Sequence, residues 1–373
     1  MTIAAGGTGG HVMPALAVAD ALRARGADVA FIGVRGTGAS GVVRAAGYRE
    51  DAIPLRGFAR RVTLGNLRTL VLAVLATPRA AGLLMRRRAD VVVGGGGYVA
   101  GPVAVAARLT RRPLLLMEAD SHLGMANRLA APLARRVTLA FPLQGRDGDR
   151  YLVTGRPVGR SVVEATKTTG RRAFGILQSA TVVLVVGGSQ GARSLNEAAV
   201  GAFADAPMEI IHVAGPRQLE ETRRLLGDRG GDRYRLVGWL DNLPEAIAAA
   251  DLVISRSGGS VFELAAIGRP AILVPYPHAT ADHQSKNAKW LSDAGAAVVV
   301  PDADLNAETL RGLVGALLSD PRRLEAMAEA ARSVGRPEAA DRVADEVLAL
   351  ARRGGRGRPR RRVPRPRMPW RRR

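Results

Sequence analysis

Two glycine-rich loops constrain the fold of this chain more than any other feature. The sequence GGTGGH occupies residues 6–11 and GGSQGA occupies residues 187–192, and each follows a short apolar run and precedes an amphipathic stretch. Glycines adopt positive φ and let the backbone approach a ligand closely. The order strand, glycine-rich loop, helix is typical of doubly wound α/β sheets. Its repetition predicts two such domains in tandem.

Apolar runs alternate with amphipathic stretches along most of the chain, which is the pattern of α/β architecture. Several of these apolar runs include a continuous stretch of Val, Ile and Leu, as expected of parallel strands buried on both faces. The predicted strands are 2–5, 28–32, 91–93, 113–117, 136–140 and 151–154, followed by 181–186, 208–214, 234–237, 252–255, 271–274 and 297–300.

The domain boundary is predicted just after the sixth run. It divides the chain into an N-terminal domain, 1–155, and a C-terminal domain, 156–350. The helical stretch 321–350 closes the fold, and its last helix is expected to pack back on the N-terminal domain. Residues 351–373 are rich in Arg, Pro and Gly without apolar periodicity, so we expect a disordered basic tail.

Composition excludes several kinds of site. The chain has no cysteine, which rules out disulfides, thiolate metal sites and Cys nucleophiles. Its formal charge is +22, and twelve arginines without an acid lie between Arg352 and Arg373. This charge favours anionic partners such as phosphates, acidic lipids or nucleic acid. The most apolar long stretch, 67–85, contains Pro78 and two arginines, and the N-terminus does not resemble a signal peptide, so we expect a cytoplasmic protein.

The first glycine-rich loop is a candidate anion site, because free N–H groups at a helix start bind anions. Pro14 is expected in the first turn of the following helix. His11 leaves the loop where the strand ends would form a binding edge. A tight turn without a ligand and a structural histidine are the alternatives for this segment.

Three further segments carry polar groups after predicted strands. Ser189 lies in the second loop, and Ser257-Gly258-Gly259-Ser260 precedes Glu263, which could accept from two ribose hydroxyls. A helix N-cap with an acid in the first turn, itself a common motif, is the alternative for the latter. In the segment 275–287, Gln284 and Asn287 share one helical face and indicate binding.

Taken together, these segments resemble the MurG family of cell-wall glycosyltransferases. The resemblance rests on GGTGGHVMPALAVA, GGGGYVAGP, the segment around Glu118, TGRPV, GGSQGARSLNEA, SRSGGSVFELAAIGRPAILVPYPHATADHQ and Asn287, which occur in the family's order. It extends from about residue 2 to about residue 350 and leaves the tail outside.

The resemblance implies a GT-B fold, in which two Rossmann-like domains face a cleft. It also implies transfer of GlcNAc from UDP-GlcNAc to the 4-hydroxyl of MurNAc in lipid I, with inversion, which gives lipid II for peptidoglycan synthesis and hence for cell shape and division. No cofactor and no metal are implied. The N-terminal domain of the family is peripheral to the cytoplasmic face of the cell membrane.

The family's site residues carry over by motif. His11 is the first candidate for the general base and Glu118 the second. The substrate contacts implied in the two glycine-rich loops and at the uracil are Thr8, Gly9, Gly10, Ser189 and the backbone of Leu240. Those implied for the diphosphate, ribose and GlcNAc are Ser257, Gly258, Gly259, Ser260, Glu263, Gln284 and Asn287.

Three departures from the family concern this site. Asp120 replaces an asparagine that contacts the donor sugar, and an ionised Asp can only accept. The family's arginine after the TGNPV-type motif is Gly159 here, so Arg156 or Arg160 is expected to substitute for it. The Ser257–Glu263 loop is one residue shorter than in well-known members.

Other readings remain open. Asp147-Gly148-Asp149 resembles a metal-binding motif but is expected to be a solvated turn. The stretch 64–88 is either a core helix or an interfacial patch for anionic lipid. Nucleic-acid binding would rest on charge alone, and Trp370 is the tail's single aromatic residue. Another GT-B enzyme, such as a UDP-GlcNAc epimerase or a transferase to a different lipid, is the alternative function.

Overall fold

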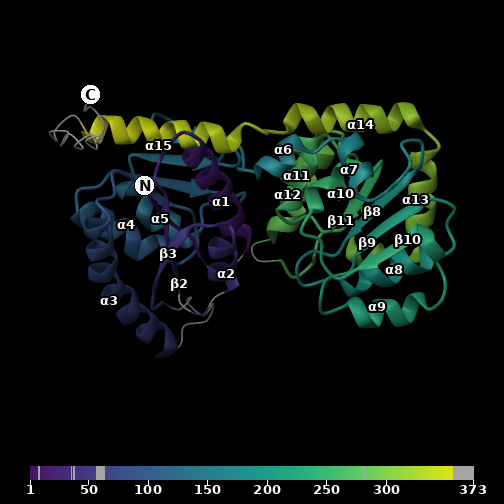
Figure 1. The fold of residues 1–373 in the computed structure, drawn as a ribbon, viewed down its shortest axis with the longest axis horizontal. Helices are drawn as coiled ribbons and strands as arrows, with labels where there is room; N and C mark the ends of the chain where they lie inside the picture. The colour runs from purple at the N-terminus through teal and green to yellow at the C-terminus, as the bar shows by residue number, and fades with distance from the viewer. Residues whose placement is uncertain (7–8, 35, 37, 56–63, 280–281, 356–373) are drawn as a thin grey trace, which may run out of the picture.

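The structure is a computed structural model that describes residues 1–6, 9–34, 36, 38–55, 64–279 and 282–355. Its described strands form two parallel sheets (Figure 1). The order in the seven-stranded sheet is β3 (Arg49–Ile53), β2 (Ala30–Val34), β1 (Thr2–Ala4), β4 (Val92–Gly94), β5 (Leu114–Glu118), β6 (Arg136–Leu139) and β7 (Tyr151–Val153). The six-stranded sheet has the order β10 (Tyr234–Val237), β9 (Glu209–Val213), β8 (Val182–Val186), β11 (Leu252–Ser255), β12 (Ala271–Leu273) and β13 (Ala297–Val299).

Helices cover both faces of each sheet, so the strands are buried on both sides. On the N-terminal half these helices are α1 (Gly9–Ala24), α2 (Gly38–Ala45), α3 (Leu64–Arg86), α4 (Ala100–Leu109) and α5 (Met125–Ala130). On the C-terminal half they are α6 (Arg160–Glu164), α7 (Lys167–Ala173), α8 (Arg193–Phe203), α9 (Leu219–Leu226), α10 (Leu243–Ala249), α11 (Ser260–Ile267), α12 (His283–Asp293), α13 (Ala307–Leu318) and α14 (Pro321–Val334). Two apolar clusters line each sheet, one per face.

The chain returns to the N-terminal half at its end. Helix α15 (Ala339–Gly355) lies over the N-terminal half, whereas α14 lies over the C-terminal half (Figure 1). Val343, Ala344 and Val347 of α15 are fully buried against α1. Arg136 also donates to Glu346 at 3.0 Å. The two halves are therefore joined by two crossings of the chain, at residues 154–159 and 335–338.

The structure confirms the alternating architecture and corrects five details. The second strand begins at Ala30 rather than residue 28, and β3 was not predicted. Helix α1 begins at Gly9, so Pro14 lies inside it rather than in its first turn. The stretch 321–350 is two helices, and α15 continues to Gly355, where disorder was predicted. Residues 356–373, the rest of the predicted tail, lie outside the described residues.

Candidate functional site

His11 lies in the first turn of α1, directly after the loop that follows β1. Its ring packs on Gly96, where an added Cβ would lie 2.6 Å from Nδ1, and Gly96 has φ +95°. Only glycine fits such a position without strain. The glycines of the GGGGYVAGP segment therefore make room for His11, a role that the sequence alone did not indicate.

The protonation state of His11 suits a proton acceptor. Burial lowers the pKa of the imidazole below its ordinary value of 6.5. The carboxylate of Asp120 raises this pKa, and the guanidinium of Arg156 lowers it. The net direction is downward, so the ring is neutral at neutral pH and has a free lone pair for a hydroxyl proton.

Glu118, the second candidate for the base, is the last residue of β5 and is 5% exposed. Its carboxylate accepts from the backbone N–H of Asp120 at 3.1 Å and of Gly124 at 2.9 Å, and from Asn127 Nδ2 at 3.0 Å. Burial raises the pKa of Glu118, and the bond from Asn127 opposes this. The carboxylate thus holds the loop 119–124 in place, and three hydrogen bonds occupy its oxygens. Because Glu118 is engaged in this way, His11 is the better candidate for the base.

The structure separates the two candidate arginines. Arg156 is 7% exposed and lies 3.6 Å from an oxygen of Asp120. Arg160 is exposed on α6 and donates to Glu164 at 2.5 Å. Arg156 is therefore the arginine that the fold places near His11 and Asp120. Arg160 instead pairs with Glu164 on its own helix.

Asp120 gives a direct test of this electrostatic arrangement. Because its carboxylate raises the pKa of His11, Asp120→Asn is expected to lower that pKa further. The acid limb of the kcat/KM profile, where the base becomes protonated, should then move to lower pH. A profile measured beside that of Asp149→Asn, an exposed loop residue, checks this. A limb that stays in place or moves to higher pH contradicts it.

On the C-terminal half, two side chains join the loop after β11 to α12. Ser257 Oγ donates to the carbonyl of Gln284 at 2.8 Å, and Asn287 Nδ2 donates to the carbonyl of Ser257 at 3.1 Å. Gln284 Oε1 accepts from the N–H of Tyr276 at 2.9 Å. Asn287 Oδ1 is buried and has no hydrogen-bond partner among the described residues. It is thus an acceptor that a ligand hydroxyl can satisfy.

Glu263 lies in the first turn of α11, after Gly258, Gly259 and Ser260. Burial raises the pKa of its carboxyl, and Arg156 opposes the shift. Within the described ranges no hydrogen bond reaches this carboxylate, so it is free to accept from two hydroxyls. Ser189 and Gly259 are exposed on their loops, and Leu240 is half-buried. Gly9 and Gly10 belong to the first turn of α1, and Thr8 lies outside the described residues.

Sequence reasoning missed the role of Arg256. Its Nη1 donates to Asp302 Oδ1 at 2.6 Å and to the carbonyl of Val274 at 3.2 Å, and its Nη2 donates to Ser194 Oγ at 2.9 Å. Arg256 therefore fixes the start of α8 and the end of β12 against each other. Its place beside the SGGS motif was the available signal, but its partners are far away in the sequence.

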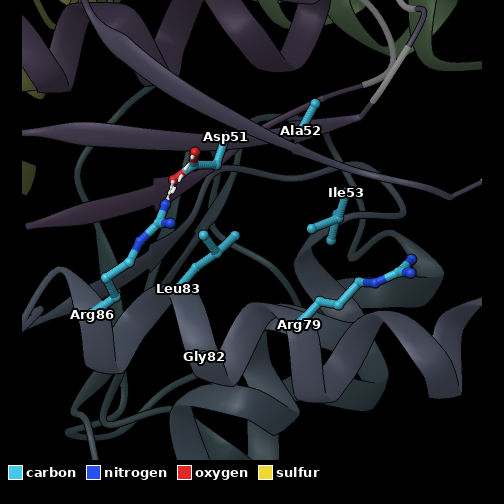
Figure 2. Close-up of a pocket in the computed structure, with 7 residues that line it drawn as sticks. All are labelled: Asp51, Ala52, Ile53, Arg79, Gly82, Leu83 and Arg86. Carbon is cyan, nitrogen blue, oxygen red and sulfur yellow. Dashed lines mark hydrogen bonds and ion pairs between the residues drawn. The ribbon is translucent and has the colours of Figure 1, made fainter.

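Two features lie away from the site. Asp147 and Asp149 are both exposed, in the loop between β6 and β7. Across the described ranges, no three His, Asp or Glu side chains gather as a metal site would require. A cavity of about 390 Å³ lies between β3 and α3 (Figure 2). Arg86 turns from one end of it toward Asp51, at 3.3 Å, and Arg79 extends at the other end.

Comparison with known proteins agrees with this geometry. Residues 1–139 match the glycosyltransferase family 28 N-terminal domain, and residues 182–343 match the corresponding C-terminal domain. A UDP-N-acetylglucosamine–N-acetylmuramyl-(pentapeptide) pyrophosphoryl-undecaprenol N-acetylglucosamine transferase from Halorhodospira halophila is 44% identical over 92% of this chain and 96% of its own. The transferase of the same name from Alkalilimnicola ehrlichii is 42% identical over 94% of this chain and 98% of its own.

Solved structures agree with the sequence matches. The crystal structure of Acinetobacter baumannii MurG has a TM-score of 0.74 at 31% identity and covers 94% of this chain and 99% of its own. A UDP-GlcNAc 2-epimerase from Neisseria meningitidis, at 14% identity and a TM-score of 0.66, shares the fold alone. The expected GT-B fold is confirmed, and the chain belongs to the MurG family of UDP-N-acetylglucosamine–N-acetylmuramyl-(pentapeptide) pyrophosphoryl-undecaprenol N-acetylglucosamine transferases.

Proposed function

We propose that this protein transfers GlcNAc from UDP-GlcNAc to the 4-hydroxyl of MurNAc in lipid I and so forms lipid II. The observation that carries the proposal is that Arg156 interacts both with a candidate base, His11, and with a candidate ribose acceptor, Glu263. A neutral His11, suited to accept a proton, comes from the N-terminal half. An unbonded Glu263 at a helix start comes from the C-terminal half. Such a pair fits an acceptor hydroxyl on one side and a nucleotide sugar on the other.

The proposed reaction is one displacement at the anomeric carbon. His11 takes the proton of the acceptor hydroxyl while its oxygen forms a bond to C1 of GlcNAc. The bond between C1 and the diphosphate oxygen breaks on the opposite face, which inverts the configuration. The leaving UDP carries the bond's electron pair and is stabilised by N–H groups at the start of α11 and in the glycine-rich loops.

Each remaining contact has a proposed part in donor binding. Glu263 accepts from the ribose hydroxyls, and the loop 257–260 holds the diphosphate. Gln284 and Asn287 contact the GlcNAc, with Asn287 Oδ1 as an acceptor. The backbone of Leu240 holds the uracil, and Ser189 with Gly9 and Gly10 borders the sugar and diphosphate. Asp120 faces the donor sugar as an acceptor, and its carboxylate also acts on His11.

The test is UDP release by the purified protein from UDP-GlcNAc, with and without a lipid I analogue that has a short, soluble tail. Release that requires the acceptor, together with a GlcNAc–MurNAc disaccharide product, supports the proposal. UDP-GlcNAc binding without acceptor-dependent release contradicts it and favours another lipid acceptor. Conversion of UDP-GlcNAc alone to its epimer favours the epimerase alternative.

We also propose that α3 brings the protein to the cytoplasmic face of an anionic membrane. No helix in the described part of the chain is long and apolar enough to cross a membrane. Val71, Val74 and Leu75 are 49%, 64% and 55% exposed, and Val74 and Leu75 lie about one helical turn after Val71. Arg79 follows on the same helix, and Arg86 to Arg88 follow at its end. Apolar side chains flanked by cations fit the surface of an anionic bilayer.

The double variant Val74→Glu, Leu75→Glu tests this surface. Because two carboxylates oppose both burial and the anionic surface, its binding to phosphatidylglycerol-containing vesicles should fall about tenfold or more. Co-sedimentation measures the bound fraction, and turnover of the soluble acceptor should be unchanged. Leu177→Glu, at a residue 75% exposed on the C-terminal half, is the matched control. Equal vesicle binding by both variants refutes the role of α3.

A further inference from the structure

Arg156 occupies the first crossing between the two halves. It follows Gly155, whose φ of +86° turns the chain after β7 and brings it against Arg336 of the second crossing. The Arg156 side chain is 7% exposed, and its charge is therefore buried. A buried guanidinium requires several acceptors to offset its lost hydration. Its partners show what it holds together.

The first partner is the carbonyl of Gly10, which accepts from Arg156 Nη2 at 2.7 Å. In an α-helix this carbonyl would accept from the N–H of the residue four positions later. That residue is Pro14, which has no N–H. Pro14 thus leaves a carbonyl free one residue before His11, and Arg156 satisfies it.

The second partner is the loop after β5. Arg156 Nη1 donates to the carbonyl of Ala119 at 2.7 Å and lies 3.6 Å from the carboxylate of Asp120. Ala119 lies between Glu118 and Asp120, so this bond fixes the backbone from which both side chains extend. The two loops of the N-terminal half that flank the proposed acceptor hydroxyl are therefore held by one side chain.

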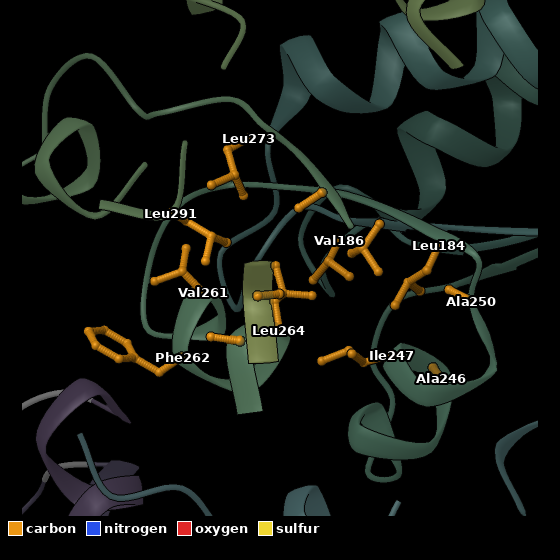
Figure 3. Close-up of a cluster of buried hydrophobic side chains, with 14 of the residues drawn as sticks. Leu184, Val186, Ala246, Ile247, Ala250, Val261, Phe262, Leu264, Leu273 and Leu291 are labelled. Carbon is orange, nitrogen blue, oxygen red and sulfur yellow. The ribbon is translucent and has the colours of Figure 1, made fainter. Parts of the chain in front are cut away.

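The third partner belongs to the C-terminal half. The Arg156 guanidinium lies over the ring of Phe262, 5.3 Å from its centre. An added Cβ at Gly259 would lie 3.0 Å from Nη2, so the donor loop also packs closely on this group. Phe262 is anchored in the apolar cluster beside Val261 and Leu291 (Figure 3). It immediately precedes Glu263 on α11.

We propose that Arg156 is a positioning residue that joins the halves, holding the backbone of His11 and Asp120 in register with α11 and Glu263. The inference rests on the proposed function and extends it. It differs from the sequence expectation that Arg156 or Arg160 takes the place of the family's substrate-binding arginine, because the two Nη groups of Arg156 donate to backbone carbonyls. Misplacing a base by about 1 Å relative to the reacting carbon is enough to slow a displacement severely.

Arg156→Gln removes the group, and Arg156→Lys keeps the charge but cannot span both carbonyls. We expect kcat to fall about tenfold in both variants, while the Kd for UDP-GlcNAc changes less than about threefold. In Arg156→Gln the acid limb of kcat/KM should also move to higher pH, because Arg156 lowers the pKa of His11. This is opposite to the shift expected for Asp120→Asn.

Pro14→Ala tests the same contact without changing Arg156. It gives the carbonyl of Gly10 a competing amide donor from its own helix. We expect a smaller loss of kcat in the same direction, with donor affinity unchanged. Arg172→Gln, an exposed arginine on α7, is the control for loss of a positive charge.

A measurement independent of turnover separates this proposal from the proposed function. The chain has no cysteine, so cysteines introduced at Arg108 and Arg224 place one spin label on each half. With UDP-GlcNAc bound, Arg156→Gln should widen the distance distribution between them. An unchanged distribution with unchanged kcat overturns the proposal, as does a loss confined to donor affinity. If the wild type releases no UDP, the proposed function fails, and the distances still test Arg156.

Discussion

Replacing His11 with alanine is expected to lower kcat by about 10²- to 10⁴-fold, the usual contribution of a positioned general base. His11 is the group near the acceptor side whose proton affinity suits the task, because burial lowers its pKa below 6.5. The affinity of the variant for UDP-GlcNAc should stay within about twofold of the wild-type value, since residues other than His11 make the proposed contacts with UDP-GlcNAc. Steady-state turnover and titration calorimetry measure the two quantities.

The pH dependence gives the same experiment a second readout. In the wild type, kcat/KM should fall only below pH 6.5, as the lowered pKa keeps the base neutral above it. The residual activity of His11→Ala should lack this acid limb. Turnover at the wild-type level in the variant would remove His11 from the chemistry. Glu118 would then be the candidate to test, despite the three hydrogen bonds that occupy its carboxylate.

Replacing Glu263 with alanine is expected to weaken UDP-GlcNAc binding about 10- to 100-fold. Hydrogen bonds to a charged group contribute about 1.5–3 kcal/mol, which corresponds to this range. The carboxylate has no competing hydrogen bond in the described part of the chain, so its full accepting capacity is available to the ribose. Calorimetry with UDP-GlcNAc measures the Kd, and Glu329→Ala, an exposed residue of α14, is the control.

A substrate analogue makes the assignment of Glu263 specific. UDP-GlcNAc that lacks one ribose hydroxyl should bind the wild type more weakly than the natural donor. Glu263→Ala should bind both donors equally, because the partner of that hydroxyl is gone. An equal preference for the natural donor in both proteins would place the ribose elsewhere, even if the alanine variant binds weakly.

The fold was largely predictable because parallel strands buried on both faces leave a clear apolar signal. Strand β3 was not predicted because it lies at the edge of the sheet, where its sequence, Arg-Glu-Asp-Ala-Ile, forms no apolar run. Of its five residues only Ile53 is buried. The start of α1 was misplaced for a different reason. Proline favours the first turn of a helix, but here Pro14 sits inside α1, where the lost hydrogen bond is replaced by Arg156.

The candidate site was predictable only as far as its loops. Glycine-rich turns after strands indicated where His11 and Glu263 would lie. The sequence could not decide between Arg156 and Arg160, since Arg156 lies within the TGRPV motif and Arg160 lies just after it. Only the path of the folded chain distinguishes them. The partners of Arg256 and the contact of Gly96 with His11 join residues far apart in the sequence. Such long-range pairs leave no local pattern.

The return of α15 to the N-terminal half affects the order in which the protein can fold during synthesis. Its buried residues complete the apolar face of α1, yet they are translated more than 300 residues after it. Until α15 has left the ribosome, the side of α1 that contacts α15 faces the solvent. The N-terminal half therefore becomes complete only after the C-terminal half has been made. A separately expressed fragment 1–155 should be unstable and should recover when a peptide of residues 339–355 is added.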